Sequence, residues 1–129
     1  MITDTDRKTL IDYRMSQAIE TIELARFLVK SKKLVIAVNR IYYGMYYALT
    51  ALALHKKFET SKHTQLIGWF NKEFVASKLV DIKYGKILRN AFQNRTKGDY
   101  DAFVEFNQEE VELLLEEMQD FIKAIKNLL

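Results

Sequence analysis

Residues 40–48 read Arg-Ile-Tyr-Tyr-Gly-Met-Tyr-Tyr-Ala, a stretch that contains four of the chain's seven tyrosines. Residues four apart are neighbours on an α-helix, so a helix here pairs Tyr42 with Tyr46 and Tyr43 with Tyr47 on adjacent faces. A helix with aromatic pairs on two faces is covered from several sides. The stretch therefore predicts a central helix that carries Arg40 as a polar group near one end.

The apolar pattern extends this central helix to about residues 34–57. Apolar side chains recur at spacings of three and four from Leu34 through Met45 to Leu52, and the tyrosines add a second stripe. A helix that is apolar over most of its circumference belongs in the middle of a bundle. Similar repeats predict long helices over residues 6–31, over residues 80–95 and from residue 107 to the C-terminus, and a shorter helix that covers residues 66–74.

Polar residues mark the ends of several predicted helices. Candidate N-caps are Asp4, Thr5 or Asp6 for the first helix, Ser61 for the short one and Asn107 for the last. The stretch 94–100, which contains Gly98, is interpreted as the end of the fourth helix.

The composition agrees with an all-α fold. The chain has no proline and only four glycines in 129 residues, so it offers few turn signals for a sheet. This length suffices for one hydrophobic core, and short connections favour antiparallel neighbours. We predict a single helical domain over residues 1–129, an antiparallel up-and-down bundle of four long helices plus one short helix.

Several chemistries have no support in the sequence. Without cysteine there is no disulfide and no thiolate ligand or nucleophile. No glycine-rich phosphate loop and no metal-ligand spacing is present, so we expect neither a cofactor nor a metal. The N-terminus has no secretory pattern, and no apolar run is long enough to span a bilayer. We expect a cytoplasmic protein that does not enter a membrane.

Charge is distributed unevenly, although the net charge is only +3. Residues 26–97 contain fifteen Lys or Arg and three acidic residues, whereas residues 98–129 contain nine acidic residues and two lysines. A basic middle suits a phosphate-binding surface, and opposite charges also suit subunits that attract each other. The alternative is that these charges simply cover solvated helix faces.

The antiparallel arrangement gathers basic residues and tyrosines at one end of the bundle. The residues expected there are Arg40, Tyr43, Arg89, Arg95, Lys97 and Tyr100. His55 and His63 fall at the opposite end, about 30 Å away at 1.5 Å per helical residue. We therefore expect that neither histidine approaches Arg95 within one chain, and we interpret His63 as part of a helix start.

Three segments, in the same order, resemble the HEPN domain family in its small prokaryotic branch. They are the run from Arg40 to Tyr47, the Ser61-Lys-His63-Thr segment followed by Phe70 and Phe74, and the Arg95-Thr-Lys-Gly-Asp99-Tyr100 segment. The resemblance extends over about residues 8–125. It implies a helical bundle that forms a homodimer, and a toxin-like protein paired with a nucleotidyltransferase antitoxin.

The resemblance also implies RNA or nucleotide binding and a metal-independent ribonuclease reaction. Active members carry an Arg-x(4–6)-His motif, in which the arginine binds the scissile phosphate and the histidine helps to transfer the proton of the ribose 2′-hydroxyl. Arg95 matches the arginine, but Tyr100 follows after four residues and no histidine stands beyond it. A tyrosine with a pKa of about 10 is a poor base at neutral pH. The degenerate motif therefore predicts weakened nuclease activity.

The resemblance and the basic end together give the candidate site residues. Arg95 and Tyr100 are the catalytic candidates, and the binding candidates for a nucleic acid or nucleotide are Arg40, Arg89, Arg95 and Lys97. Some HEPN toxins have a tyrosine near the motif that the partner transferase modifies with AMP, and Tyr100 is the candidate here. Alternatively, Arg95 forms an ion pair with Asp99 or another acid, and the protein is a non-catalytic dimeric helical interaction module that recognises a partner protein.

Overall fold

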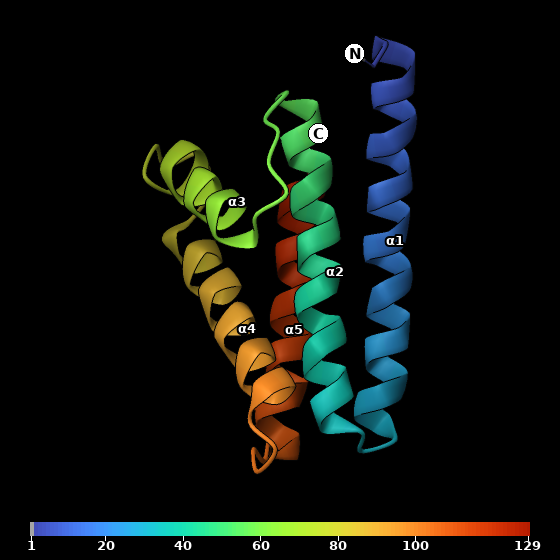
Figure 1. Cartoon of the computed structure of the whole chain (residues 1–129), viewed down its shortest axis with the longest axis vertical. Coiled ribbons are helices and arrows are strands. Elements are labelled where there is room, and N and C mark those ends of the chain that lie inside the picture. Colours follow the sequence, from blue (N-terminus) through green and yellow to red (C-terminus); the bar gives the residue numbers. More distant parts are fainter. Residues whose placement is uncertain (1) are drawn as a thin grey trace.

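The computed structural model describes residues 2–129, which form helices joined by short connections (Figure 1). The elements are α1 (Asp4–Lys30), α2 (Leu34–His55), α3 (His63–Phe70), the π-helical turn η1 (Asn71–Val75), α4 (Ile82–Tyr100) and α5 (Gln108–Lys126). The four long helices run alternately in opposite directions, and α3 lies across one side of the bundle. The predicted all-α antiparallel bundle of four long helices plus one short helix is confirmed.

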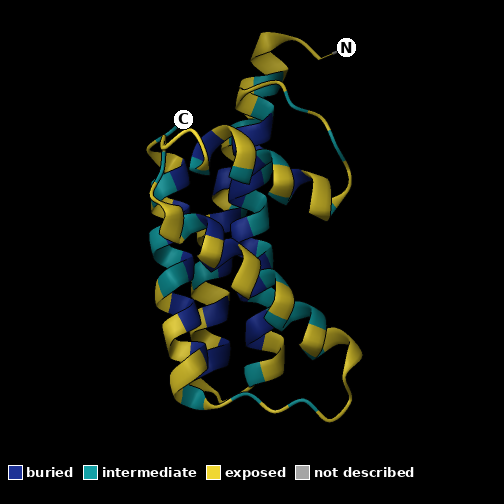
Figure 2. Ribbon diagram, turned by 90° about the vertical axis from the view of Figure 1, so that its left-hand side faces the viewer, coloured by how far each residue is buried: buried dark blue, intermediate teal, exposed yellow. Residues whose placement is uncertain are grey.

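Helix α2 occupies the centre of the bundle and packs against α1, α3, α4 and α5. Its buried side chains cover most of its circumference, as its two apolar stripes predict. Figure 2 shows a continuous buried core between the long helices and exposed residues on their outer faces. Among the four tyrosines of α2, only Tyr42 is fully buried, with 1% of its surface exposed. The other three are half-buried and can take part in a site.

The helix starts show which N-cap predictions hold. The Asn107 side chain accepts a hydrogen bond from the Glu110 N–H at 2.8 Å, which confirms the predicted start of α5. At α1, none of the predicted caps is used. Instead, the Thr3 hydroxyl accepts from the Asp6 N–H at 3.0 Å, and the helix begins one residue later. Threonine and aspartate are both favourable N-cap residues, so the local backbone selects among the adjacent candidates Thr3, Asp4, Thr5 and Asp6.

The connection between α2 and α3 reverses direction. Residues 56–62 leave the end of α2 and return alongside it, so α3 begins beside the middle of α2 (Figure 1). The Thr60 hydroxyl accepts from the Lys62 N–H at 3.1 Å within this connection. Lys62 stands at the start of α3 without a capping side chain, so the prediction of Ser61 as the cap is wrong.

Helix α4 is longer than predicted. The predicted bound of about residue 95 is too short, because α4 continues through Gly98 to Tyr100, the last residue of the stretch 94–100 that the sequence marks as its end. Gly98 does not have a positive φ and faces Phe106 and Val35, so it lies inside the helix as a packing position and not as a turn. The additional turn places Asp99 on the same helix face as Arg95.

No helix within residues 2–129 combines the length and the apolar character needed to cross a membrane.

Gly44 is a position where α2 packs closely against both α1 and α5. A Cβ atom at this position of α2 would overlap the terminal methyl group of Met118 on α5 and would lie 3.3 Å from Thr21 Cγ2 on α1. Met118 is completely buried, so its methyl group cannot move into solvent. The absence of a side chain at Gly44 therefore sets the spacing of α1, α2 and α5.

We predict that Gly44→Val destabilises the bundle by about 1–3 kcal/mol, the usual cost of inserting side-chain atoms into a packed core. Thermal or urea unfolding followed by circular dichroism measures this loss. Gly68→Ala is the matched control, because a Cβ at exposed Gly68 would meet no atom within 4 Å. The control should be neutral or stabilising by up to about 1 kcal/mol. Equal stabilities of the two variants would contradict the packing argument.

Candidate functional site

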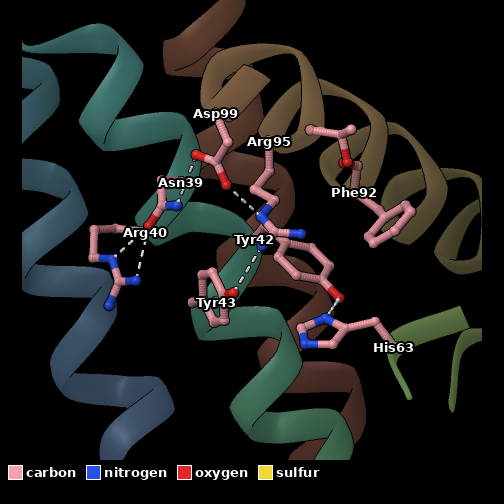
Figure 3. A network of polar contacts seen from close by, with 9 residues as sticks. Asn39, Arg40, Tyr42, Tyr43, His63, Phe92, Arg95 and Asp99 are labelled. Carbon is pink, nitrogen blue, oxygen red and sulfur yellow. Dashed lines mark hydrogen bonds and ion pairs between the residues drawn. The ribbon is translucent and has the colours of Figure 1, made fainter.

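Polar and aromatic side chains from α2, α3 and α4 meet on one side of the bundle (Figure 3). We call this cluster the Arg95 network, and its members are Asn39, Arg40, Tyr42, Tyr43, His63, Arg95 and Asp99. It combines two guanidinium groups, one carboxylate and one imidazole in a partly buried setting. No other cluster in the described chain holds this combination of groups with direct contacts between them.

Arg95 is the centre of the network. Its Nη2 donates to the Tyr43 hydroxyl at 2.9 Å, and its Nε lies 2.8 Å from Asp99 Oδ2. Within residues 2–129 the buried Nε has no acceptor in hydrogen-bond geometry, so the Asp99 contact is an ion pair only. The guanidinium carbon lies 5.6 Å from the ring centre of Tyr42 and 5.2 Å from that of Tyr43. Helix α2 thus fixes the direction of the Arg95 head group.

The sequence leaves open whether Arg95 binds a phosphate or forms an ion pair with an acid such as Asp99. The structure contains the ion pair with Asp99. The side chain of Arg95 nevertheless keeps 17% of its surface exposed. A guanidinium has five N–H donors, and the contacts to Asp99 and Tyr43 engage only part of them. Arg95 therefore retains donors for a ligand while its orientation is already set.

Arg40 joins the network through Asn39. The Arg40 Nε and Nη2 atoms donate to Asn39 Oδ1 at 2.9 and 2.8 Å, and Asn39 Nδ2 donates to Asp99 Oδ1 at 3.1 Å. The Arg40 guanidinium lies 4.9 Å from the ring centre of Tyr43, the ring that Arg95 also contacts. Within the described residues, no carboxylate lies at ion-pair distance from Arg40. One carboxylate therefore faces two guanidinium groups.

His63 also belongs to this network, so the prediction that neither histidine approaches Arg95 is wrong. Its Nδ1 lies 2.6 Å from the Tyr42 hydroxyl, and its ring stacks on Tyr46 with centres 4.2 Å apart. Burial and the positive charge of Arg95 lower the pKa of His63. The physical reason is the path of residues 56–62: seven extended residues span up to about 23 Å. This connection returns the chain along α2.

The remaining candidates lie outside the network. Arg89 is exposed on α4 and borders a groove with η1, and Lys97 is exposed near the end of α4. Tyr100 ends α4 with 80% of its surface exposed. His55 lies at the end of α2 beside the first turns of α1. The structure thus brings Arg40 and Arg95 into one network, whereas within residues 2–129 no hydrogen bond or ion pair joins the side chains of Arg89, Lys97 or Tyr100 to it.

Within residues 2–129, no three His, Asp or Glu side chains lie close enough together to hold a metal ion. The donors of the Arg95 network are mainly N–H groups, which attract anions and not cations. The chemistry of this site is therefore that of anion recognition.

The fold is an all-α helical bundle, and comparison with known proteins identifies its family. Residues 11–128 match the model of the HEPN domain family. The chain belongs to the HEPN family, as its sequence motifs indicate.

Relatives cover almost the whole chain. A UPF0332 protein of Thermotoga maritima is 36% identical over 124 residues, which are 96% of this chain and 94% of that protein. A Methanocaldococcus jannaschii protein named "Putative toxin MJ0142" is 32% identical over 122 residues, 95% of this chain and 83% of that protein. A second protein of that organism, "Putative toxin MJ0605", is 31% identical over 110 residues, 85% of this chain and 81% of that protein.

The environment of His63 predicts a loss of stability at acid pH. Its pKa in the folded chain is lower than the value of 6.5 that applies to an unperturbed histidine. As the pH falls through 6.5, the unfolded chain binds a proton before the folded chain does, so the free energy of unfolding decreases. We expect His63→Gln to flatten this dependence in urea unfolding at a series of pH values around 6.5. His55→Gln, the control, should keep the slope that His63 contributes, and an unchanged slope in His63→Gln would disprove the assignment.

Proposed function

We propose that this HEPN protein binds RNA or a nucleotide through phosphate contacts centred on Arg95, and that it is the toxin-like half of a toxin–antitoxin pair. The observation that carries the proposal is the orientation of Arg95 between Asp99 and Tyr43, which leaves guanidinium donors available. Guanidinium groups bind phosphate through two parallel hydrogen bonds. The names of the two M. jannaschii relatives support the toxin assignment.

Charge in the Arg95 network supports a phosphate ligand. Arg40 and Arg95 both contact the Tyr43 ring, whereas Asp99 is the only carboxylate in the network. A phosphate group supplies the negative charge that the cluster lacks. Because both arginines are held by hydrogen bonds before the ligand arrives, little side-chain entropy is lost on binding.

The proposed reaction on RNA is metal-independent attack of a ribose 2′-hydroxyl on the adjacent phosphodiester. The bond between the 2′-oxygen and phosphorus forms while the bond from phosphorus to the 5′-oxygen of the next nucleotide breaks, which gives a 2′,3′-cyclic phosphate. Water accepts the 2′-hydroxyl proton, and Tyr100 or water protonates the departing 5′-oxygen. Arg95 would stabilise the negative charge of the phosphorane, which is a transition-state interaction. Tyr100 occupies the place of the family histidine in the motif, and its exposed hydroxyl is accessible to RNA. Arg89 and Lys97 are exposed on the same helix and would contact neighbouring phosphates.

The proposed partners are a second copy of the chain and a nucleotidyltransferase antitoxin. Two pairs of exposed apolar side chains on α1 support the homodimer, Leu10 with Tyr13 and Leu24 with Phe27. Tyr100 is accessible to a transferase, and attachment of AMP there would add a negative charge near the end of α4. That charge would compete with a phosphate ligand for the basic side chains.

The competing function is a non-catalytic dimeric interaction module that recognises a partner protein through the same basic side chains. The observation in its favour is the replacement of the motif histidine by Tyr100, together with the ion pair that already engages Arg95. In this case RNA would be neither bound tightly nor cleaved.

We predict that the purified protein binds single-stranded RNA with an affinity that falls steeply with salt concentration, because phosphate contacts release counterions. Arg95→Gln should weaken binding by at least about tenfold, the effect of one lost charge-assisted hydrogen-bond pair. Fluorescence anisotropy with labelled RNA measures both effects. Lys86→Gln is the control, because it removes one exposed positive charge of α4 outside the network. Equal losses in the two variants would indicate general electrostatic attraction without a site.

We predict cleavage of an RNA pool in the presence of EDTA, with a rate that Arg95→Ala lowers by at least about 100-fold through loss of transition-state stabilisation. Tyr100→Phe then tests whether that hydroxyl takes part. Circular dichroism of each variant controls for folding. Absence of cleavage by the folded wild-type protein would exclude the nuclease and favour the interaction module.

A further inference from the structure

The tautomer of His63 follows from the burial of Tyr42. Tyr42 lies in the core, and burial raises the pKa of its hydroxyl far above the usual range, so the hydroxyl keeps its proton. A buried O–H needs an acceptor, and within residues 2–129 its hydrogen-bond partner is His63 Nδ1 at 2.6 Å. Tyr42 therefore donates and Nδ1 accepts. In the neutral imidazole the proton must then reside on Nε2.

The Nε2 edge is the part of His63 that remains accessible. In Figure 3 the Nδ1 atom faces the Tyr42 hydroxyl, and the other ring nitrogen points away from it. One face of the ring is covered by Tyr46 in a nearly parallel stack with an angle of 6°. The side chain as a whole is half-buried. The ring is thus held on two sides while its Nε2–H is free to donate.

The surroundings of His63 disfavour a positive imidazolium and offer no orienting acid. The titratable groups that face it are Tyr42, Tyr43 and Tyr46 from α2 and Arg95 from α4, and Lys62 precedes it on the exposed start of α3. Within the described chain no carboxylate forms an ion pair with His63. A general base that works through Nε2 needs a lone pair there, but that nitrogen carries the proton.

We propose that His63 is a phosphate-binding residue that shares one anion site with Arg95 and donates its Nε2–H to a phosphate oxygen. This inference rests on the proposed phosphate ligand of Arg95, and it adds a second donor from a different helix. Tyr43 connects the two groups, because its ring lies 5.9 Å from the His63 ring centre and 5.2 Å from the Arg95 guanidinium carbon. Tyr42 is a positioning residue, since it acts by fixing the tautomer of His63.

A bound phosphate changes the protonation of His63 in a defined direction. In the free protein the positive charge of Arg95 disfavours a second positive charge on the imidazole. A phosphate anion between them offsets that repulsion and favours the protonated ring. Ligand binding should therefore raise the pKa of His63 and become tighter as the pH falls through that pKa.

Two histidines in the whole chain make the test direct. His55→Gln leaves His63 as the only histidine, so its ring nitrogens can be followed without assignment by long-range ¹H–¹⁵N NMR. The probes are adenosine 5′-monophosphate and a short single-stranded RNA without terminal phosphates, which distinguish a nucleotide from the phosphodiesters of RNA. We expect the Nε2–H tautomer in the free protein and a rise in the pKa of His63 with the preferred probe. We expect no rise when Arg95→Gln is added.

Binding of the same probes to His63 variants shows whether His63 acts as a hydrogen-bond donor or as a base. His63→Ala should weaken binding about tenfold, the effect of losing one hydrogen bond to a charged group. His63→Gln should retain most of the affinity, because its amide offers an N–H near the place of Nε2 but cannot act as a base. Tyr42→Phe should give a mixture of tautomers and weaker binding. Circular dichroism confirms that each variant is folded.

Three results would overturn the inference: the Nδ1–H tautomer, a pKa of His63 that does not rise with either probe, or wild-type affinity in His63→Ala. If binding is lost in Arg95→Gln and unchanged in His63→Ala, the phosphate site at Arg95 stands and only the role of His63 fails. If neither probe binds to the wild-type protein, the proposed function and this inference both fail.

Discussion

The buried hydroxyl of Tyr42 is the constraint on which the candidate site depends. A phenol at the centre of a bundle contributes apolar surface to the core, but its hydroxyl must find a partner there. His63 provides that partner and thereby holds the first residue of α3 against the middle of α2. The loop before α3 must return along α2 to make this contact, and the short helix therefore lies across the bundle instead of extending it.

The aromatic rings of α2 then organise the charges around them. Tyr43 contacts both Arg40 and Arg95, and its hydroxyl accepts a hydrogen bond from Arg95. Asp99 is available to the same group only because α4 continues through Gly98 to Tyr100. Helices α2, α3 and α4 thus all contribute side chains to the network. The tyrosines of α2 lie at the centre of the fold, and they also determine where the Arg95 network forms.

The sequence predicts the helices well and the site only in part. Periodicity locates α2 as the central helix, and Asn107 marks the start of α5, because both signals depend on neighbouring residues alone. The contact between His63 and Tyr42 depends on the direction of a polar loop, which no local pattern specifies. The expectation at Gly98 fails because glycine permits a turn but does not require one, and α4 continues through it.

The placement of His63 also changes what the degenerate motif means. The sequence of α4 lacks the histidine that the family motif places after Arg95, and the exposed Tyr100 occupies that position. In space α3 supplies an imidazole whose ring contacts Tyr42 and Tyr43, the same two rings that the Arg95 guanidinium contacts. Catalysis and binding depend on the positions of groups and not on their order in the chain. However, the hydrogen bond from Tyr42 gives this imidazole a proton on its accessible nitrogen, so its position restores a donor to the site without restoring a base.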